Sequence, residues 1–177
     1  RVSRGLGDVY KRQLAERAKA LKEEIQRAIE TIGKTFTEEF GMVYAYETDG
    51  YGMYNLMDDA NVPSLLAMSY LGYEGEPEVS SNTRRFLLSE ANPFYFKGDK
   101  AAGIGSPHTP SNYIWHIAMA IQGLTSETRE EKLEILKNMA ATTGGKGVMH
   151  EGFCCEDDSK FTRAWFSWAN AMYAELF

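Results

Sequence analysis

The feature that most constrains the fold of this chain is an apolar repeat near its N-terminus. Between residues 14 and 33, aliphatic side chains recur every three or four positions and charged side chains lie between them. The repeating positions are Leu14, Ala18, Leu21, Ile25, Ala28, Ile29 and Ile32. This spacing puts the aliphatic side chains on one face of an α-helix, and glycine, here Gly33, commonly follows a helix C-terminus. The sequence therefore predicts an amphipathic helix over residues 14–33.

Further helix signals alternate with loops along the rest of the chain. We expect helices to begin near residues 61, 80, 109, 126 and 162, where Asn, Ser or Thr precedes an apolar repeat. The segment MVYAYETDGYGMY is broken at Asp49-Gly50 and predicts a short extended stretch or a hairpin. Because the strand signal is too weak for a βαβ arrangement, the sequence predicts an all-α fold whose loops at one end carry the chemistry.

Composition and charge exclude several classes of function. The 177 residues, 44% hydrophobic and 25% charged, are typical of one globular domain. The net charge of −6 argues against general nucleic-acid binding, and no apolar run approaches the roughly 20 residues that cross a bilayer. Cys154 and Cys155 are adjacent and make no disulfide framework. They fit ordinary thiols in a reducing compartment, so we expect a cytoplasmic protein that binds neither nucleic acid nor membranes.

The first residues differ from the rest of the chain. The stretch RVSRGLGDVYKRQ shows neither a helical nor a strand period and has no secretory signal. We interpret residues 1–13 as extraneous and residues 14–177 as the C-terminal portion of a single domain.

Four polar segments are candidates for a functional site. They are MDDANVPS (57–64), GIGSPHTPSNYIW (103–115), GVMHEGF (147–153) and DDSKFTRAWFSWAN (157–170). Each combines acids, amides or hydroxyls with apolar or aromatic residues, a mixture suited to sugars, because polar groups bind hydroxyls and aromatic faces cover the C–H surface of the ring. Glu151, between Gly147 and Gly152 in a stretch without helical period, belongs either to an ordinary polar loop or to a site that holds a carboxylate.

These residues also have other interpretations. Asp58 and Asp59 precede an expected helix, whose dipole favours carboxylates without any ligand, and His108 can hydrogen-bond within its own loop. Trp165 and Trp168 fit a buried helix face better than a sugar platform. Carboxylates and imidazoles together also suit a zinc, manganese or iron site, although no H-x-x-x-H or H-E-x-x-H pair is present. The candidate metal ligands are Asp58, Asp59, His108, His116, His150 and Glu151.

Taken together, these segments resemble glycoside hydrolase family 125, the exo-α-1,6-mannosidases. The resemblance runs from about residue 42 to the C-terminus. Its matching stretches are YAYETDGYGMYNLMDDANVPSLL, YLGY, NTRRFLLSEANPFYFKG, GIGSPHTPSNYIW, QGLTS, MHEGF and FTRAWFSWANAMYAEL. It implies an (α/α)6 toroid, and the number of expected helices corresponds to its C-terminal half. The resemblance also implies hydrolysis of terminal α-1,6-linked mannose with inversion and without a metal or other cofactor.

The resemblance assigns roles to particular residues. Glu151 matches the general base of the family, in its HE motif. The residues that would line the mannose subsite are Asp58, Asp59, Asn61, His108, Thr109 and His150. The motifs do not say which of them touch the sugar and which only brace the loops. The general acid of the family is an Asp upstream of the matched region, and nothing before residue 42 carries a matching motif.

Three functions follow as expectations. The first is an exo-α-1,6-mannosidase fragment that lacks the general acid and is inactive without the missing N-terminal half of its own domain. The second is a module that binds α-1,6-linked mannosides without cutting them. The third is a metal-dependent hydrolase that uses the same acids and imidazoles.

Overall fold

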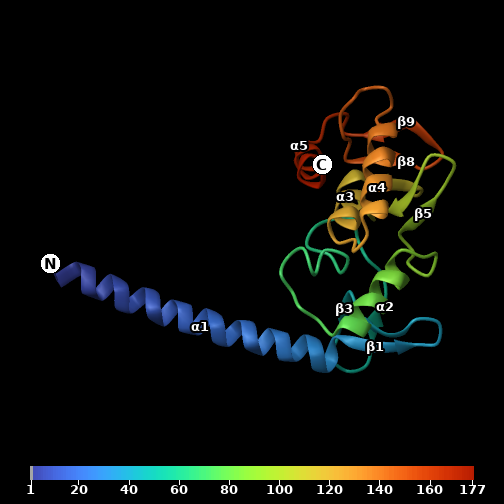
Figure 1. Cartoon of the computed structure of the whole chain (residues 1–177). Helices are drawn as coiled ribbons and strands as arrows, with labels where there is room; N and C mark the ends of the chain where they lie inside the picture. The colour runs from blue at the N-terminus through green and yellow to red at the C-terminus, as the bar shows by residue number, and fades with distance from the viewer. Residues whose placement is uncertain (1) are drawn as a thin grey trace.

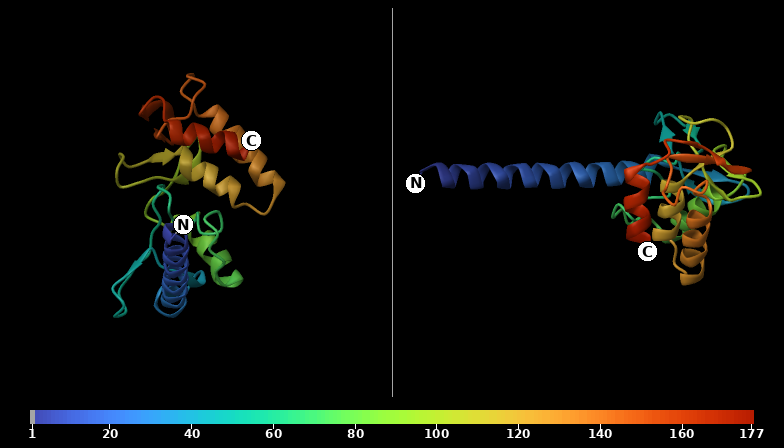
Figure 2. Two further views of the ribbon diagram at one scale, coloured as in Figure 1. Left: turned by 90° about the vertical axis from the view of Figure 1, so that its left-hand side faces the viewer. Right: turned by 90° about the horizontal axis from the view of Figure 1, so that it is seen from above.

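The computed structural model describes the backbone of residues 2–177 and the side chains of residues 9–177. A long N-terminal helix projects from a body of shorter helices and strands (Figures 1 and 2). The five helices of residues 2–177 are α1 (Val2–Ile32), α2 (Pro77–Leu87), α3 (His116–Leu124), α4 (Arg129–Ala141) and α5 (Ser167–Leu176). The nine strands of the same residues are β1 (Lys34–Thr37), β2 (Gly41–Tyr44), β3 (Glu47–Thr48), β4 (Tyr54–Asn55), β5 (Tyr95–Lys97), β6 (Ala102–Ile104), β7 (Tyr113–Trp115), β8 (Gly152–Cys154) and β9 (Asp157–Thr162).

Helix α1 confirms the predicted amphipathic helix, and it begins earlier than expected, at Val2. It therefore includes residues 2–13, in which the sequence shows no helical period. The origin of residues 1–13 and the domain boundary at residue 14 stay predictions, and Arg1 lies outside the described residues. No described helix combines the length and the apolar character needed to cross a bilayer.

A polar cluster joins the end of α1 to the body. The Glu30 carboxylate accepts hydrogen bonds from Lys34 and from the hydroxyls of Tyr44 and Tyr73. Lys34 also binds Glu76, which lies just before α2. Although partial burial alone raises the pKa of Glu30, the bonds from Lys34, Tyr73 and Tyr44 together lower it to about 2. The cluster thus holds an ionised carboxylate at the base of the projecting helix.

The predicted hairpin around Asp49-Gly50 is confirmed. Strands β3 and β4 pair antiparallel, with Glu47 opposite Asn55. The Asp49 carboxylate accepts the backbone N–H groups of Tyr51 and Met53, and Gly50 adopts a positive φ of 75°. The aspartate side chain and the glycine backbone therefore form the turn that the sequence indicates.

The helix expected from residue 61 is absent from the described structure. Residues 61–72 form bends and successive tight turns instead, such as the bond from the N–H of Ala67 to the carbonyl of Ser64. The Asp58 carboxylate accepts the N–H groups of Leu65 and Leu66. Within a helix, only the N–H groups of the first turn are free to bind such a side chain. The prediction of a helix start at Asn61 is therefore wrong: its side-chain amide donates to Asp59, and only turns follow it.

Four helices begin at other positions than expected. The helix predicted near residue 80 is α2, which starts at Pro77, a residue suited to a first turn. The helix predicted from residue 126 is α4, whose start is capped by Thr128, which accepts the N–H of Glu131. The helix predicted from residue 109 begins later, as α3, because strand β7 occupies residues 113–115. The helix predicted from residue 162 begins later, as α5, because Thr162 still belongs to β9 and residues 163–166 form bends and irregular backbone.

The prediction of an all-α fold is wrong, and with it the expected half of an (α/α)6 toroid. The described residues are mixed α/β: they contain four small antiparallel sheets, of two, two, two and three strands. The strands are two to six residues long, too short for a period of two to stand out in a sequence. Apart from β2, β3 and β4, which lie in or next to the predicted extended segment, they occupy stretches where the sequence predicts no strand.

The largest sheet and three helices enclose the core near the C-terminus. In the order β7-β8-β9, Trp115 lies opposite Gly152, and Gly152 lies opposite Thr162. Helix α3 follows β7 directly and packs between α4 and α5, so that its residues His116–Ile121 are all buried. Fully buried large side chains of the molecule include Tyr44, Leu87, Ile104, Ile114, Ile117, Met119, Ile121, Met139 and Phe153. This sheet fixes the segment before β8, where Glu151 lies.

Candidate functional site

Glu151 lies in a bend between the buried His150 and strand β8. Its backbone N–H donates to the carbonyl of Thr162 at 3.3 Å, which attaches it to the end of β9. Its carboxylate Oε1 lies 3.3 Å from Nε of Arg163, and the side chain is 13% exposed. Glu151 is thus a carboxylate on the edge of the core, fixed on its backbone by a sheet and on its side chain by an ion pair.

Arg163, the partner of Glu151, has an unusual backbone. Its φ is 42°, a left-handed conformation that non-glycine residues rarely adopt. Its guanidinium lies 5.6 Å from the centre of the Phe166 ring, while its side chain remains 65% exposed. Strained residues concentrate at functional sites, and this one lies directly against the candidate catalytic carboxylate.

The loop that contains His108 and Thr109 reaches the same place through two aromatic side chains. The indole N–H of Trp115 donates to the Thr109 hydroxyl at 3.0 Å. The Trp115 ring meets the Phe166 ring edge to face, with centroids 6.5 Å apart. Thr109, Trp115, Phe166 and Arg163 therefore form a continuous series of contacts that ends at Glu151. His108 is exposed, and its backbone N–H donates to the Ser106 hydroxyl.

The segment with Asp58, Asp59 and Asn61 is attached to that loop by its backbone. The N–H of Ala60 donates to the carbonyl of Gly105 at 3.0 Å. The Asp59 carboxylate accepts hydrogen bonds from the backbone N–H of Asn61 and, at both of its oxygens, from the side-chain amide of Asn61. The structure thus connects three of the four polar segments to the fourth, as a shared site requires.

Asp58 and Asp59 are both buried, but the oxygens of Asp58 bind backbone groups seven and eight residues farther along the chain. They accept the N–H groups of Leu65 and Leu66 at 2.9 and 3.0 Å. Burial raises the pKa of Asp58 to about 7, even though these backbone bonds lower it and the charge of Asp59 adds a smaller increase. Asn92 accepts the N–H of Asp58, so two buried polar side chains hold this segment.

His150 is also fully buried. Its Nδ1 lies 2.6 Å from the carbonyl oxygen of Ala164, and its Nε2 lies 2.9 Å from that of Thr143. Its ring stacks on Phe161, with centroids 3.9 Å apart and an interplanar angle of 12°. His116 lies beside it, and burial lowers the pKa of His116 to about 4. The polar atoms of the His150 ring therefore face the protein backbone.

The structure does not gather the candidate metal ligands. Among the residues whose side chains are described, no three His, Cys, Asp or Glu side chains are arranged to hold a metal ion. The imidazoles of His116 and His150 are both occupied by hydrogen bonds inside the core.

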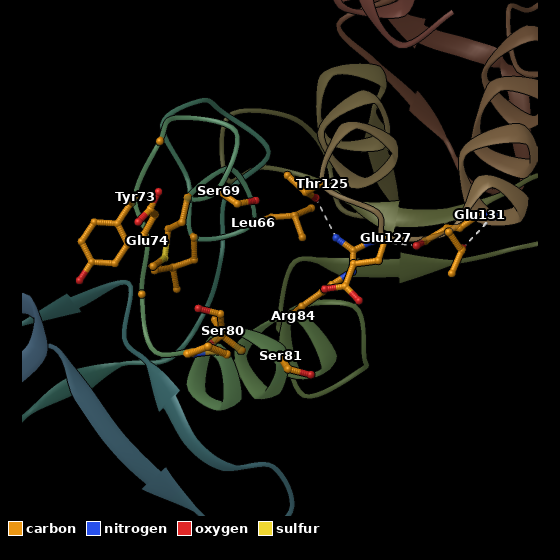
Figure 3. A pocket seen from close by; sticks show the side chains of 17 residues that line it. Leu66, Ser69, Tyr73, Glu74, Ser80, Ser81, Arg84, Thr125, Glu127 and Glu131 are labelled. Atoms are coloured by element: carbon orange, nitrogen blue, oxygen red, sulfur yellow. Dashed lines mark hydrogen bonds and ion pairs between the residues drawn. The ribbon is translucent and has the colours of Figure 1, made fainter.

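A cavity of about 640 Å³ lies elsewhere, between the turns at residues 65–75, helix α2 and the segment before α4 (Figure 3). Ser80, Glu74 and Glu127 line it, and none of the predicted site residues does. Its one guanidinium, on Arg84, binds Thr125 and Glu131.

Sequence reasoning missed four residues that organise the site. They are Asn92, Trp115, Arg163 and Phe166. Arg163, Phe166 and Trp115 all fall within stretches that carry the family resemblance, but nothing in their spacing indicates which of them faces Glu151. Asn92 lies in a long loop, and no local pattern predicts its bond to the backbone of Asp58.

Comparisons with known proteins show the family of this chain. The sequence profile of the metal-independent α-mannosidases, GH125, matches residues 2–177. The chain is 44% identical over 165 residues to the meiotically up-regulated gene 157 protein of Schizosaccharomyces pombe. The matched region is 92% of this chain and 32% of that protein. It also resembles the solved structure of a Streptococcus pneumoniae protein from the metal-independent α-mannosidases, described as a non-productive complex with α-1,6-mannobiose. The TM-score is 0.87 at 48% identity, covering 90% of this chain and 38% of that one.

The chain spans about a third of the length of the relatives it matches. The profile match nevertheless covers almost every residue, including all four polar segments and Glu151. The chain therefore belongs to glycoside hydrolase family 125, the metal-independent α-mannosidases.

Proposed function

We propose that this chain is part of an inverting exo-α-1,6-mannosidase, which removes terminal mannose from mannosides or N-glycans. The observation that carries the proposal is Glu151, a carboxylate that is only 13% exposed and is held by an ion pair with Arg163. The mannobiose in the related Streptococcus pneumoniae structure supports the α-1,6 linkage. Membership of the family supports hydrolysis of α-mannosides.

Glu151 is the general base in this mechanism. In an inverting glycosidase, one carboxylate deprotonates a water that attacks the anomeric carbon, while a carboxylic acid on the opposite face protonates the leaving oxygen. Arg163 holds Oε1 of Glu151, so we assign Oε2 to the water. The two carboxyl groups of such enzymes stand roughly 6.5–9.5 Å apart, which leaves room for that water.

The predicted sugar-binding residues divide into two groups. Asn61, His108 and Thr109 are partly or fully exposed, and Asp59, although only 6% exposed, is paired with Asn61, so we assign these four residues to the mannose hydroxyls. Asp58 and His150 are fully buried and bind backbone groups, so we assign them to bracing the loops.

The general acid, in this proposal, belongs to a part of the enzyme outside these 177 residues. Two observations support it: the chain spans 38% of the related Streptococcus pneumoniae chain, and the resemblance assigns the acid to a region upstream of residue 42. The chain alone then has the base and part of the sugar site and is inactive or nearly so.

The test of the mechanism uses a full-length enzyme that contains this chain. Proton NMR during hydrolysis of α-1,6-mannobiose should show β-mannose as the first product, because inversion reverses the anomeric configuration. Glu151→Gln should lower kcat by about a thousandfold or more, since the amide cannot accept the proton. Glu134→Gln, an exposed substitution on α4, is the control with unchanged activity. First release of α-mannose would contradict the assignment of Glu151 as base.

A mannoside-binding module is the second candidate, favoured by the non-productive complex with α-1,6-mannobiose described for the related Streptococcus pneumoniae protein. Titration calorimetry of the 177-residue chain with α-1,6-mannobiose separates the two functions. Binding without hydrolysis, together with an inactive full-length protein, would favour the module. Loss of full-length activity in EDTA would instead favour the metal-dependent hydrolase.

A further inference from the structure

The ring of His150 has a carbonyl oxygen beside each of its two nitrogens. Nδ1 lies 2.6 Å from the carbonyl of Ala164, and Nε2 lies 2.9 Å from that of Thr143. A carbonyl oxygen can only accept a hydrogen bond, and a neutral imidazole has a single N–H. A neutral ring would therefore direct one nitrogen lone pair at a carbonyl oxygen inside the core. Only the imidazolium satisfies both contacts.

The aromatic surroundings of the ring also favour a cation. The face of Phe161 lies parallel to the imidazole, with centroids 3.9 Å apart. Aromatic faces are negative and attract cations stacked on them. A positive charge at this fully buried position thus meets three electron-rich groups, two carbonyl oxygens and one ring face.

The neighbouring titratable groups are compatible with that charge. Nδ1 of His116 accepts the N–H of His150 at 3.1 Å and lies 3.2 Å from the carbonyl oxygen of the same residue, and its Nε2 donates to the Thr142 hydroxyl, so a single proton, on Nε2, serves its ring. The two rings lie 5.8 Å apart, and a neutral His116 avoids repulsion between two cations. Glu151 follows His150 in the chain, supplies a negative charge and is paired with Arg163, which directly precedes Ala164. On the other side of the ring, Asp158 accepts the N–H of Gly144, the residue after Thr143.

We propose that His150 is a doubly protonated positioning residue that ties the segment after α4 to the segment before α5, and so fixes Arg163 against Glu151. The bond to Ala164 anchors the residue directly after Arg163, whose left-handed backbone directs its side chain to the carboxylate. The bond to Thr143 anchors the other side of the ring to the end of α4. The positioning of a catalytic base rests on the proposed function, whereas the protonation of the ring does not.

The protonation is tested on the 177-residue chain, without any activity. Long-range ¹⁵N–¹H NMR at pH 7 should show a proton on each ring nitrogen of His150, and His116 should show one. Spectra of His150→Gln and His108→Gln assign the signals by their loss. A His150 ring with one unprotonated nitrogen at pH 7 would overturn the proposal, whatever the enzyme does.

The positioning is tested in a full-length enzyme by separating kcat from KM. The glutamine of His150→Gln has its N–H donors on a single nitrogen, so it reaches only one of the two carbonyls. We expect kcat to fall by at least about tenfold while KM changes by less than about threefold. A large rise in KM with unchanged kcat would mean that His150 contacts the sugar, and would overturn the positioning role. If Glu151→Gln leaves activity intact while the NMR result holds, the proposed base is wrong and the charged histidine stands.

Discussion

At the scale of single residues, the sequence identifies the polar groups of the site but not what each one binds. The resemblance selects Asp58, Asp59 and His150 alike, because all three lie in specific motifs. In the structure, Asp58 and His150 bind backbone groups inside the core, while Asp59 forms a pair with Asn61 at its edge. The difference depends on burial and on partners distant in the chain, neither of which a short motif records.

The buried Asp58 carboxyl gives a pH-dependent stability. Its pKa, raised to about 7 mainly by burial, lies above the ordinary value of 3.8, so the folded chain binds more protons than the unfolded chain between these values. The contribution of Asp58 is therefore fully present below about pH 4 and is lost as the pH rises through about 7. Asp58→Asn should remove this slope, because the amide does not titrate and resembles the neutral carboxyl that folding favours. At pH 4.5 it should change the free energy of unfolding by less than about 1 kcal/mol, because both side chains are neutral there and each accepts well through one oxygen.

Urea unfolding between pH 4.5 and pH 8, chosen to span about that window, measures the effect. The matched control is Asp49→Asn, whose carboxylate also accepts two backbone N–H groups but is exposed. An equal pH slope in the wild type and in Asp58→Asn would show that Asp58 does not carry the protonation change.

At the scale of elements, the sequence predicts long periodic segments well and short strands poorly. The repeat of α1 spans several turns, and its helix is confirmed. Strands such as β8 have three residues, and pairing with distant partners at residues 113–115 and 157–162 forms them. Local pattern contains no information about those partners. The sequence therefore predicts helices from residues 109 and 162, whereas strands β7 and β9 precede α3 and α5 there.

The polar cluster around Glu30 anchors α1 to the body of the molecule. The pKa of Glu30 is lowered to about 2, so its contribution to stability is present above its ordinary value of 4.5 and is lost as the pH falls toward 2. Glu30→Gln keeps the shape but removes the charge that holds Lys34, and should lower the free energy of unfolding at pH 7 by roughly 1–2 kcal/mol. Thermal unfolding at pH 7 and pH 3 should show a smaller difference between variant and wild type at the lower pH.

Glu24→Gln is the control for that measurement, because Glu24 is exposed on the same helix. It should leave the melting temperature within about 1 °C of the wild type, as is usual for surface substitutions. A Glu30→Gln variant as stable as this control would mean that the cluster does not anchor α1.

At the scale of the whole molecule, the family was predictable and the fold class was not. Several motifs in the right order identify the family, whose profile matches residues 2–177. The fold class requires knowing whether aromatic loops pair as strands. Here they do, in four antiparallel sheets of the described residues, so the sequence-based expectation of helices alone was wrong.

The projecting helix α1 exposes an apolar stripe to solvent. Figures 1 and 2 show it extending away from the body, and its apolar stripe has no cover: Tyr10, Leu14, Leu21 and Ile25 are 63%, 43%, 56% and 51% exposed. A continuous apolar stripe on a soluble chain favours association, because contact removes its surface from water. We expect the 177-residue chain to self-associate at micromolar concentrations in sedimentation velocity. Leu21→Glu should shift the distribution toward monomer by at least about tenfold in the apparent dissociation constant.

The control for this change is Gln26→Glu, which adds the same charge to α1 but lies outside the stripe, about 140° around the helix from Leu21, given about 100° of rotation per residue. If charge repulsion alone caused dissociation, both variants would become monomeric to the same extent. If the stripe is the contact, only Leu21→Glu acts, and the association strengthens with salts that favour apolar burial. A wild-type chain that sediments as a monomer at every concentration would contradict the prediction, since the exposed stripe would then have no effect on association.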